Sequence, residues 1–145
     1  MAGILNIGEM GALALHVLVE LAVLREENPD ARKSIQSIAG HLHASPHTLQ
    51  KVSHRLIMME LIDSVRGANG GLRLLADPQR ITLLDVLEGV EGKFSSNECL
   101  FSKRVCPPSA RCAFSKITGE MEQMVRGYFS GTTIADLCAM AMQSA

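Results

Sequence analysis

Residues 45–74 read SPHTLQKVSHRLIMMELIDSVRGANGGLRL, and this stretch decides the fold. It opens on Ser45 and Pro46, a typical N-cap residue followed by a proline in the first helical turn. Apolar residues then recur at helical spacing and predict a buried face of Leu49, Val52 and either Leu56 or Ile57. The other face carries His47, Gln50, Lys51, His54 and Arg55. The stretch therefore begins with a helix that exposes polar and basic side chains.

A shorter helix is expected just before this one. Ser34 is a suitable N-cap, and a buried stripe of Ile35, Ile38, Ala39 and Leu42 follows at helical spacing. The dipeptide His43-Ala44 joins the two helices in a tight turn. Two short helices joined in this way predict a helix-turn-helix.

A β-hairpin is expected directly after the helix-turn-helix. Leu61–Arg66 suits a strand, and Leu72–Leu75 alternates as the returning strand. Between them, Gly67–Gly71 forms a turn that can reach positive φ. A hairpin in this position is a wing.

The remaining elements are helices. They are expected from Glu9 to Arg25, from the N-cap Thr82 to Gly92, from Ala113 to about Phe129, and after Thr133. The predicted fold class is mainly α with a small β-hairpin wing: a winged helix-turn-helix plus a long C-terminal dimerisation helix. The expected division is residues 1–92 for DNA binding, 93–112 for a cysteine loop, and 113–145 for dimerisation and the tail.

The composition excludes several classes of protein. Hydrophobic residues make up 47% and aromatic residues 3% of the 145 residues, which favours one helical domain over a sandwich or barrel. No apolar run reaches the roughly 18 residues of a spanning helix, and the first residues lack the basic start of a signal peptide. We therefore expect a cytoplasmic protein without membrane contact. No nucleophile–base pair or phosphate loop appears, so an enzyme is not expected.

The charge is unevenly distributed along the chain. The net charge is −1, but residues 32–73 hold six basic and two acidic residues, a balance of +4. The remainder holds eight basic and thirteen acidic residues, a balance of −5. Such a local excess of positive charge is what a polyanion site requires, although a solvated helix face would also carry charges.

The helix-turn-helix and wing together predict a site for double-stranded DNA. Gln50 and Lys51 can hydrogen-bond base edges in a major groove, while Arg55 contacts phosphate. Arg66, at the base of the wing, is placed to enter a minor groove. The candidate DNA-binding residues are Ser45, His47, Thr48, Gln50, Lys51, Arg55, Arg66, Asn69 and Arg73.

Three cysteines occur in one polar segment, with the spacing Cys99-x6-Cys106-x5-Cys112. Disulfides do not suit a cytoplasmic protein, and thiolates select zinc, copper(I) or iron–sulfur clusters. Basic residues between the cysteines favour the thiolate form. Paired C-x2-4-C spacing, typical of structural zinc, is absent, so the spacing favours a larger inorganic core. Unligated thiols are the alternative.

Two further residues bear on metal binding. His16 lies on the apolar face of the expected first helix, where a core histidine is the ordinary interpretation. A mixed cluster with three cysteines leaves a position that an imidazole can fill, so His16 is also a ligand candidate. Cys138 lies at helical spacing in an apolar segment and is expected in the core.

A stripe of Ile117, Met121, Met124 and Tyr128 marks one face of the long C-terminal helix. This is more apolar surface than a lone protomer of this size should expose, so a homodimer is expected. Two wings about one DNA turn apart would then read a pseudo-palindromic operator.

Two segments carry a resemblance to a known family. Residues 64–74, SVRGANGGLRL, and residues 81–92, ITLLDVLEGVEG, closely resemble the bacterial regulator family of IscR, NsrR and CymR. The similarity spans essentially the whole chain. It implies a homodimeric winged-helix transcription factor, with a cysteine loop that often holds a [2Fe–2S] or [4Fe–4S] iron–sulfur cluster. Redox or nitric-oxide chemistry at the cluster then alters DNA affinity.

The resemblance also places individual residues. Residues 48–51 match the helix motif usually written Tyr-Leu-Glu-Gln, and Arg66 matches the minor-groove arginine of the wing. Ser115 stands where some cluster regulators have a histidine ligand, and Ala12 where nitric-oxide-sensing members have an acidic residue. His16 matches a ligand position in a redox-sensing branch, and Glu9 is a second candidate. The fourth ligand is therefore open.

Two other functions remain as alternatives. One is a clusterless winged-helix regulator of cysteine or sulfur metabolism that is controlled by a protein partner. The other is a zinc-stabilised protein-interaction module that uses the wing surface. The three cysteines of this chain count against the first alternative, because that branch of the family often lacks the three-cysteine segment.

Overall fold

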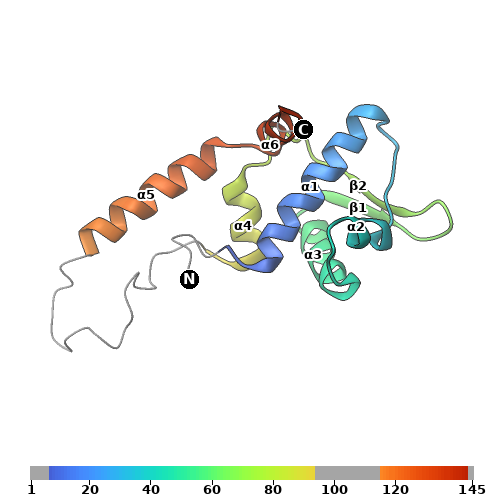
Figure 1. Cartoon of the computed structure of the whole chain (residues 1–145), viewed down its shortest axis with the longest axis horizontal. Helices are drawn as coiled ribbons and strands as arrows, with labels where there is room; N and C mark the ends of the chain where they lie inside the picture. The colour runs from blue at the N-terminus through green and yellow to red at the C-terminus, as the bar shows by residue number, and fades with distance from the viewer. Residues whose placement is uncertain (1–6, 94–114, 144–145) are drawn as a thin grey trace.

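The computed structural model describes residues 7–93 and 115–143. The elements in these ranges are α1 (Glu9–Glu27), α2 (Ile35–His41), α3 (Pro46–Met58), β1 (Ile62–Val65), β2 (Gly71–Leu74), α4 (Leu83–Glu91), α5 (Ser115–Gly131) and α6 (Ile134–Gln143). Helix α1 runs through the middle of the molecule, with the other elements arranged around it (Figure 1). No helix within the described ranges combines the length and the apolar character needed to cross a membrane.

Helix α1 supplies the centre of the core. Its side chains Val17, Leu18 and Leu21 are almost fully buried, and α3, α4, α6 and β2 all pack against it. Because apolar residues occur on several sides of α1, one helix can serve all these neighbours at once. The fully buried side chains around it include Ile38 of α2, Leu49 of α3, Ile62 of β1 and Val86 of α4.

The helix-turn-helix predicted from the sequence is present. Ser34 caps α2, because its Oγ accepts a hydrogen bond from the backbone N–H of Ser37 (3.1 Å). The connection to α3 bends sharply at His43, which has a φ of 51° in the left-handed region. Ser45 is the N-cap of α3, and Pro46 follows it at the first helical position.

The wing is a two-stranded antiparallel hairpin. Ile62 pairs with Leu74 and Val65 with Gly71, so the strands are slightly shorter than the sequence pattern suggests. Leu72 also exchanges two backbone hydrogen bonds with Lys33 (2.8 and 3.0 Å), which joins the wing to the segment before α2. The wing is therefore fixed to the helix-turn-helix through its backbone.

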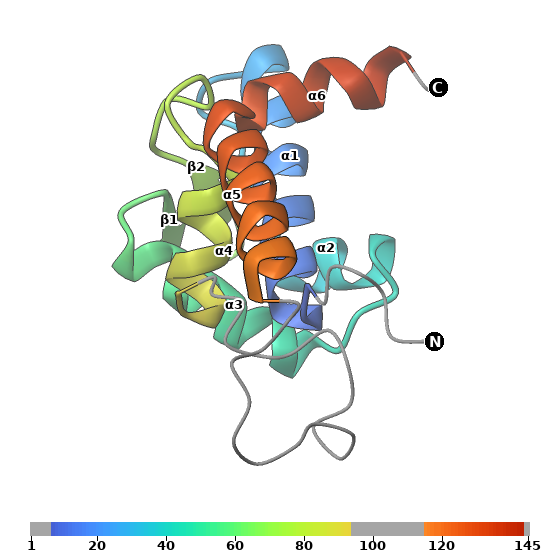
Figure 2. The same cartoon turned by 90° about the vertical axis from the view of Figure 1, so that its left-hand side faces the viewer.

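The C-terminal elements pack against α4 and α1. Helix α4 begins at the predicted N-cap Thr82 and ends before Gly92, which has a φ of 99°. Phe129 of α5 is buried in a second, smaller cluster with Leu83 and Leu87 of α4. The first half of α5 projects from the body of the molecule, whereas α6 lies against α1 (Figures 1 and 2).

Glycine is required at position 71 for two separate reasons. Its φ is +139°, and a Cβ atom there would lie 2.7 Å from the carbonyl oxygen of Lys33. We therefore expect Gly71→Ala to lower the free energy of unfolding by about 2–3 kcal/mol, because it strains the backbone and breaks the contact between wing and Lys33. Urea denaturation at a fixed protein concentration measures this change.

The same substitution at Gly40 is the control. Gly40 lies within α2 and a Cβ there would meet nothing within 4 Å, so Gly40→Ala should raise stability by about 0.5–1 kcal/mol. Equal effects at both positions would show that the wing is not held at Gly71 in the way described.

Candidate nucleic-acid interface

Helix α3 presents its polar face outward and its apolar face to the core. Leu49, Val52 and Leu56 are fully buried, which resolves the choice between Leu56 and Ile57 in favour of Leu56. The buried hydroxyl of Ser53 donates a hydrogen bond to the carbonyl oxygen of Leu49 (2.8 Å), so it does not go unpaired in the core. The rotation of α3 about its axis is therefore fixed by packing. The exposed side chains on the opposite face are His47, Gln50, Lys51, His54 and Arg55.

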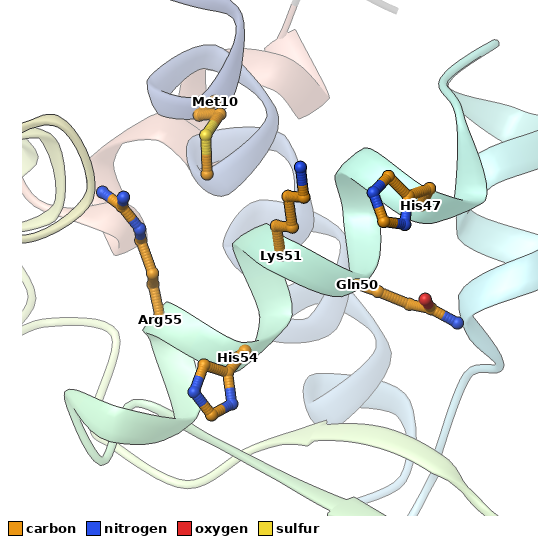
Figure 3. A pocket seen from close by; sticks show the side chains of 6 residues that line it. All are labelled: Met10, His47, Gln50, Lys51, His54 and Arg55. Carbon is orange, nitrogen blue, oxygen red and sulfur yellow. The ribbon is translucent and has the colours of Figure 1, made fainter.

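An open groove of about 510 Å³ runs along this face of α3. Its lining consists of five α3 side chains and one from the first turn of α1, namely His47, Gln50, Lys51, His54, Arg55 and Met10. Lys51 and Arg55 extend toward the side of α3 on which Met10 lies, whereas His54 points the other way (Figure 3). The groove thus has a cationic wall on α3 and an apolar wall at Met10.

The turn of the wing projects from the body of the molecule beside the helix-turn-helix (Figure 1). Arg66 and Asn69 lie in or next to this turn, and both are exposed. Gly67 has a φ of 117°, and a Cβ there would meet nothing within 4 Å, so the turn is open to solvent around it. An arginine in this position can reach a surface that α3 itself does not touch.

Three of the six cations in residues 32–73 are occupied by ion pairs within the protein. Lys33 pairs with Glu20 of α1. Asp63 of β1 lies 3.3 Å from the Arg73 guanidinium and 3.9 Å from that of Arg32, and Arg73 is also 3.7 Å from Asp30. The pairs of Asp63 and Arg73 connect the wing to the segment before α2. Arg73, which was predicted to contact DNA, therefore helps to hold the wing in place.

The other three cations are Lys51, Arg55 and Arg66. All three are exposed, and within the described part of the chain none of them lies within salt-bridge distance of a carboxylate. They belong to α3 and the wing turn, which are the elements that carry the predicted DNA contacts. The sequence pattern did not show which of the six cations are neutralised, because the pairing carboxylates include Glu20 and Asp30, outside the basic stretch.

The remaining predicted contact residues have different surroundings. Ser45 is exposed, and its side chain makes no capping hydrogen bond to α3. Thr48 is half-buried at the first turn of α3. Met10 was not among the predicted site residues. A lone methionine at the start of an apolar helix carries no sequence signal for a binding surface.

The structure corrects the interpretation of His16 as a core residue. Its side chain is exposed, because the neighbouring residues Val17 and Leu18 occupy the buried face of α1. Since α1 is apolar on several sides, the periodicity of its sequence did not identify the solvent-facing position. The exposed imidazole of His16 is therefore accessible for binding a metal or another group at the protein surface.

The cysteines fall into two groups. Cys99, Cys106 and Cys112 lie outside the described residues. Cys138 is buried against α1 in the main core, as predicted. Burial, together with the nearby charge of Glu26, raises the pKa of the Cys138 thiol, which disfavours the thiolate that metal binding needs. Within residues 7–93 and 115–143, no three His, Cys, Asp or Glu side chains form a group able to hold a metal ion.

Comparison with protein families gives one match over nearly the whole chain. The model of the Rrf2 family, described as "Iron-dependent Transcriptional regulator", matches residues 7–140. The chain is also 30% identical over 125 residues to the HTH-type transcriptional regulator NsrR of Bacillus subtilis (strain 168). That alignment covers 86% of this chain and 84% of the relative.

Two solved structures are similar over most of their length. The structure of CymR, the global cysteine regulator of B. subtilis, has a TM-score of 0.75 at 27% identity and covers 94% of this chain and 98% of that one. T. potens IscR has a TM-score of 0.73 at 23% identity, with 97% and 90% covered. At 23% identity, the similarity to IscR is evidence for the fold only. These comparisons confirm the predicted winged helix-turn-helix and the resemblance seen in the sequence.

Proposed function

Since this chain belongs to the Rrf2 family and is a transcriptional regulator, we propose that α3 and the wing read its operator and that an iron–sulfur cluster sets its affinity for DNA. Regulators of this family are not enzymes, which confirms the expectation from the sequence. The observation that carries the DNA-reading part is the position of the three cations of residues 32–73 that have no carboxylate partner among the described residues. Lys51, Arg55 and Arg66 all lie on α3 or at the wing.

Helix α3 and the wing would contact different grooves of the DNA. An exposed helix fits a major groove, where Gln50 and Lys51 meet base edges. Arg55, one turn further along α3, contacts phosphate. Arg66 at the exposed wing turn enters the adjacent minor groove, whose width depends on sequence. Arg73 and Asp63 hold the wing at the angle that this requires.

The functional unit is a homodimer formed through α5. Phe129 is the only buried residue of this helix, whereas Ile117, Met124 and Tyr128 are 54%, 74% and 65% exposed. An isolated helix of 17 residues is marginally stable in water, so the projecting half of α5 needs a partner surface. A second copy supplies the same apolar stripe by two-fold symmetry. The two wings then meet a pseudo-palindromic operator in double-stranded DNA.

The donor set fits an iron–sulfur cluster. Cys99, Cys106 and Cys112 supply three thiols from one short segment that also contains Lys103, Arg104 and Arg111. Cys138 is excluded by its burial and its raised pKa. His16 is the candidate for the remaining ligand position. Because its side chain is exposed on α1, it could bind the cluster of its own subunit or that of the partner subunit. A bound [2Fe–2S] or [4Fe–4S] cluster would supply sensitivity to oxidants or nitric oxide.

A clusterless regulator controlled by a protein partner is the second candidate. The similarity in fold to CymR supports it, because that protein is described as the global cysteine regulator of B. subtilis. In that case the three cysteines would be unligated.

Substitutions on α3 and the wing should separate two kinds of contact. Arg55→Ala should weaken binding to all duplexes about tenfold and reduce the slope of log K against log salt by about one, because one phosphate contact is lost. Lys51→Ala should change which sequences are preferred. Titrations of a duplex selected from a random library by the wild-type protein, at several salt concentrations, measure both effects. If Lys51→Ala combined with Arg66→Ala left the affinity unchanged, this surface would not be the DNA site.

A charge placed in the α5 stripe should dissociate the dimer. Met124→Glu buries a carboxylate in the proposed interface, so it should give a monomer at micromolar concentration. Gln123→Glu adds the same charge at a neighbouring exposed position outside the stripe and should leave the dimer intact. Sedimentation velocity distinguishes the two states. A wild-type monomer, or equal effects of both variants, would contradict this interface.

Removal of one thiol should remove the chromophore. After anaerobic reconstitution with iron and sulfide, Cys106→Ala should lack visible absorption, whereas His16→Ala should keep a more labile cluster. Cys138→Ala is the matched control and should retain the wild-type spectrum, since Cys138 lies in the core. A colourless wild-type protein would contradict the cluster, and metal analysis would then distinguish a zinc site from free thiols.

A further inference from the structure

The first turn of α1 is held by a residue from the other end of the winged domain. Gly8 is the N-cap of α1 and has no side chain to satisfy the free N–H groups of the helix. The carboxylate of Glu91 replaces the missing cap. Its Oε2 accepts a hydrogen bond from the N–H of Gly8 (3.1 Å), and its Oε1 accepts one from the N–H of Gly11 (2.8 Å).

Both glycines are needed for this close approach. A Cβ at Gly8 would lie 2.3 Å from Oε1 of Glu91. A Cβ at Gly11 would lie 2.9 Å from the Glu91 carboxylate and 2.9 Å from the side chain of Leu87. Two positions without side chains therefore face one carboxylate, and together they form a clamp between α1 and α4.

The position of Glu91 is unfavourable for its own helix. It is the last residue of α4, where the helix dipole disfavours a negative charge. At the N-terminus of α1 the same charge is favoured. Local helix preference therefore does not account for an acidic residue here, whereas the contact with α1 does.

The clamp lies next to the groove of the DNA surface. Met10, which forms the wall opposite α3, stands between the two clamped residues Gly8 and Gly11 in the sequence. Lys51 and Arg55 extend toward this wall (Figure 3). We propose that Glu91 is a positioning residue for DNA binding: it fixes the first turn of α1, and thereby the wall that faces Lys51 and Arg55 across the open groove. This inference rests on the proposed DNA-reading role of α3.

The sign of the effect of Glu91→Gln tests the proposal. Removing a negative charge should by itself strengthen binding to a polyanion slightly. If Glu91 positions the groove, Glu91→Gln should instead weaken binding about fivefold, because an NH2 donor replaces one of the two acceptor oxygens and then faces a backbone N–H group. The probe is the duplex selected from a random library by the wild-type protein. Glu27→Gln, at the far end of α1, makes the same change of charge and should not weaken binding.

A double-mutant cycle distinguishes positioning from general loss of stability. In a protein that already carries Lys51→Ala and Arg55→Ala, Glu91→Gln should change affinity less than twofold, because the side chains that it positions are gone. Faster hydrogen exchange at the N–H groups of Gly8 and Gly11 should accompany the loss in affinity. A fivefold loss in both backgrounds, or unchanged affinity of Glu91→Gln alone, would overturn the proposal. A wild-type protein that selects no duplex would instead contradict the proposed function.

Discussion

The burial of α1 is the constraint on which the rest of the structure depends. Its apolar residues form the common core of the helix-turn-helix, the wing, α4 and α6. Polar contacts hold it at both ends: Glu91 binds its first turn, and Arg25 near its C-terminus donates a hydrogen bond to the carbonyl oxygen of Ala76 (2.7 Å). The surface that faces DNA in our proposal is therefore built on one rigid support.

The ion pairs explain how a chain with a net charge of −1 can offer a basic surface. Lys33 pairs with Glu20 of α1, and Arg73 pairs with Asp63 of the wing and with Asp30 of the segment before α2. Among the residues that the structure describes, Lys51 and Arg55 have no carboxylate within salt-bridge distance, and both are exposed on α3. The positive charges thus divide into a supporting set and a set that is available to a polyanion.

The local signals in the sequence were sufficient for most of the fold. Pro46 marks the start of α3 because its fixed φ suits the first helical position, and Gly71 marks the hairpin because its positive φ favours glycine. Contacts between residues far apart in the sequence could not be predicted. No residue near Glu91 indicates that its carboxylate caps a helix 80 residues away. His16 was misplaced because α1 is apolar on several sides. The cysteine site rests on the sequence alone.

The central claim is that α3 and the wing turn together form the DNA surface. Hydrogen-exchange mass spectrometry of the protein with and without the selected duplex tests it directly, because bound DNA shields the backbone that it covers. We predict protection in residues 45–55 and 64–71, with little change in α6. Protection confined to α2 or α6, with none at α3, would contradict the account.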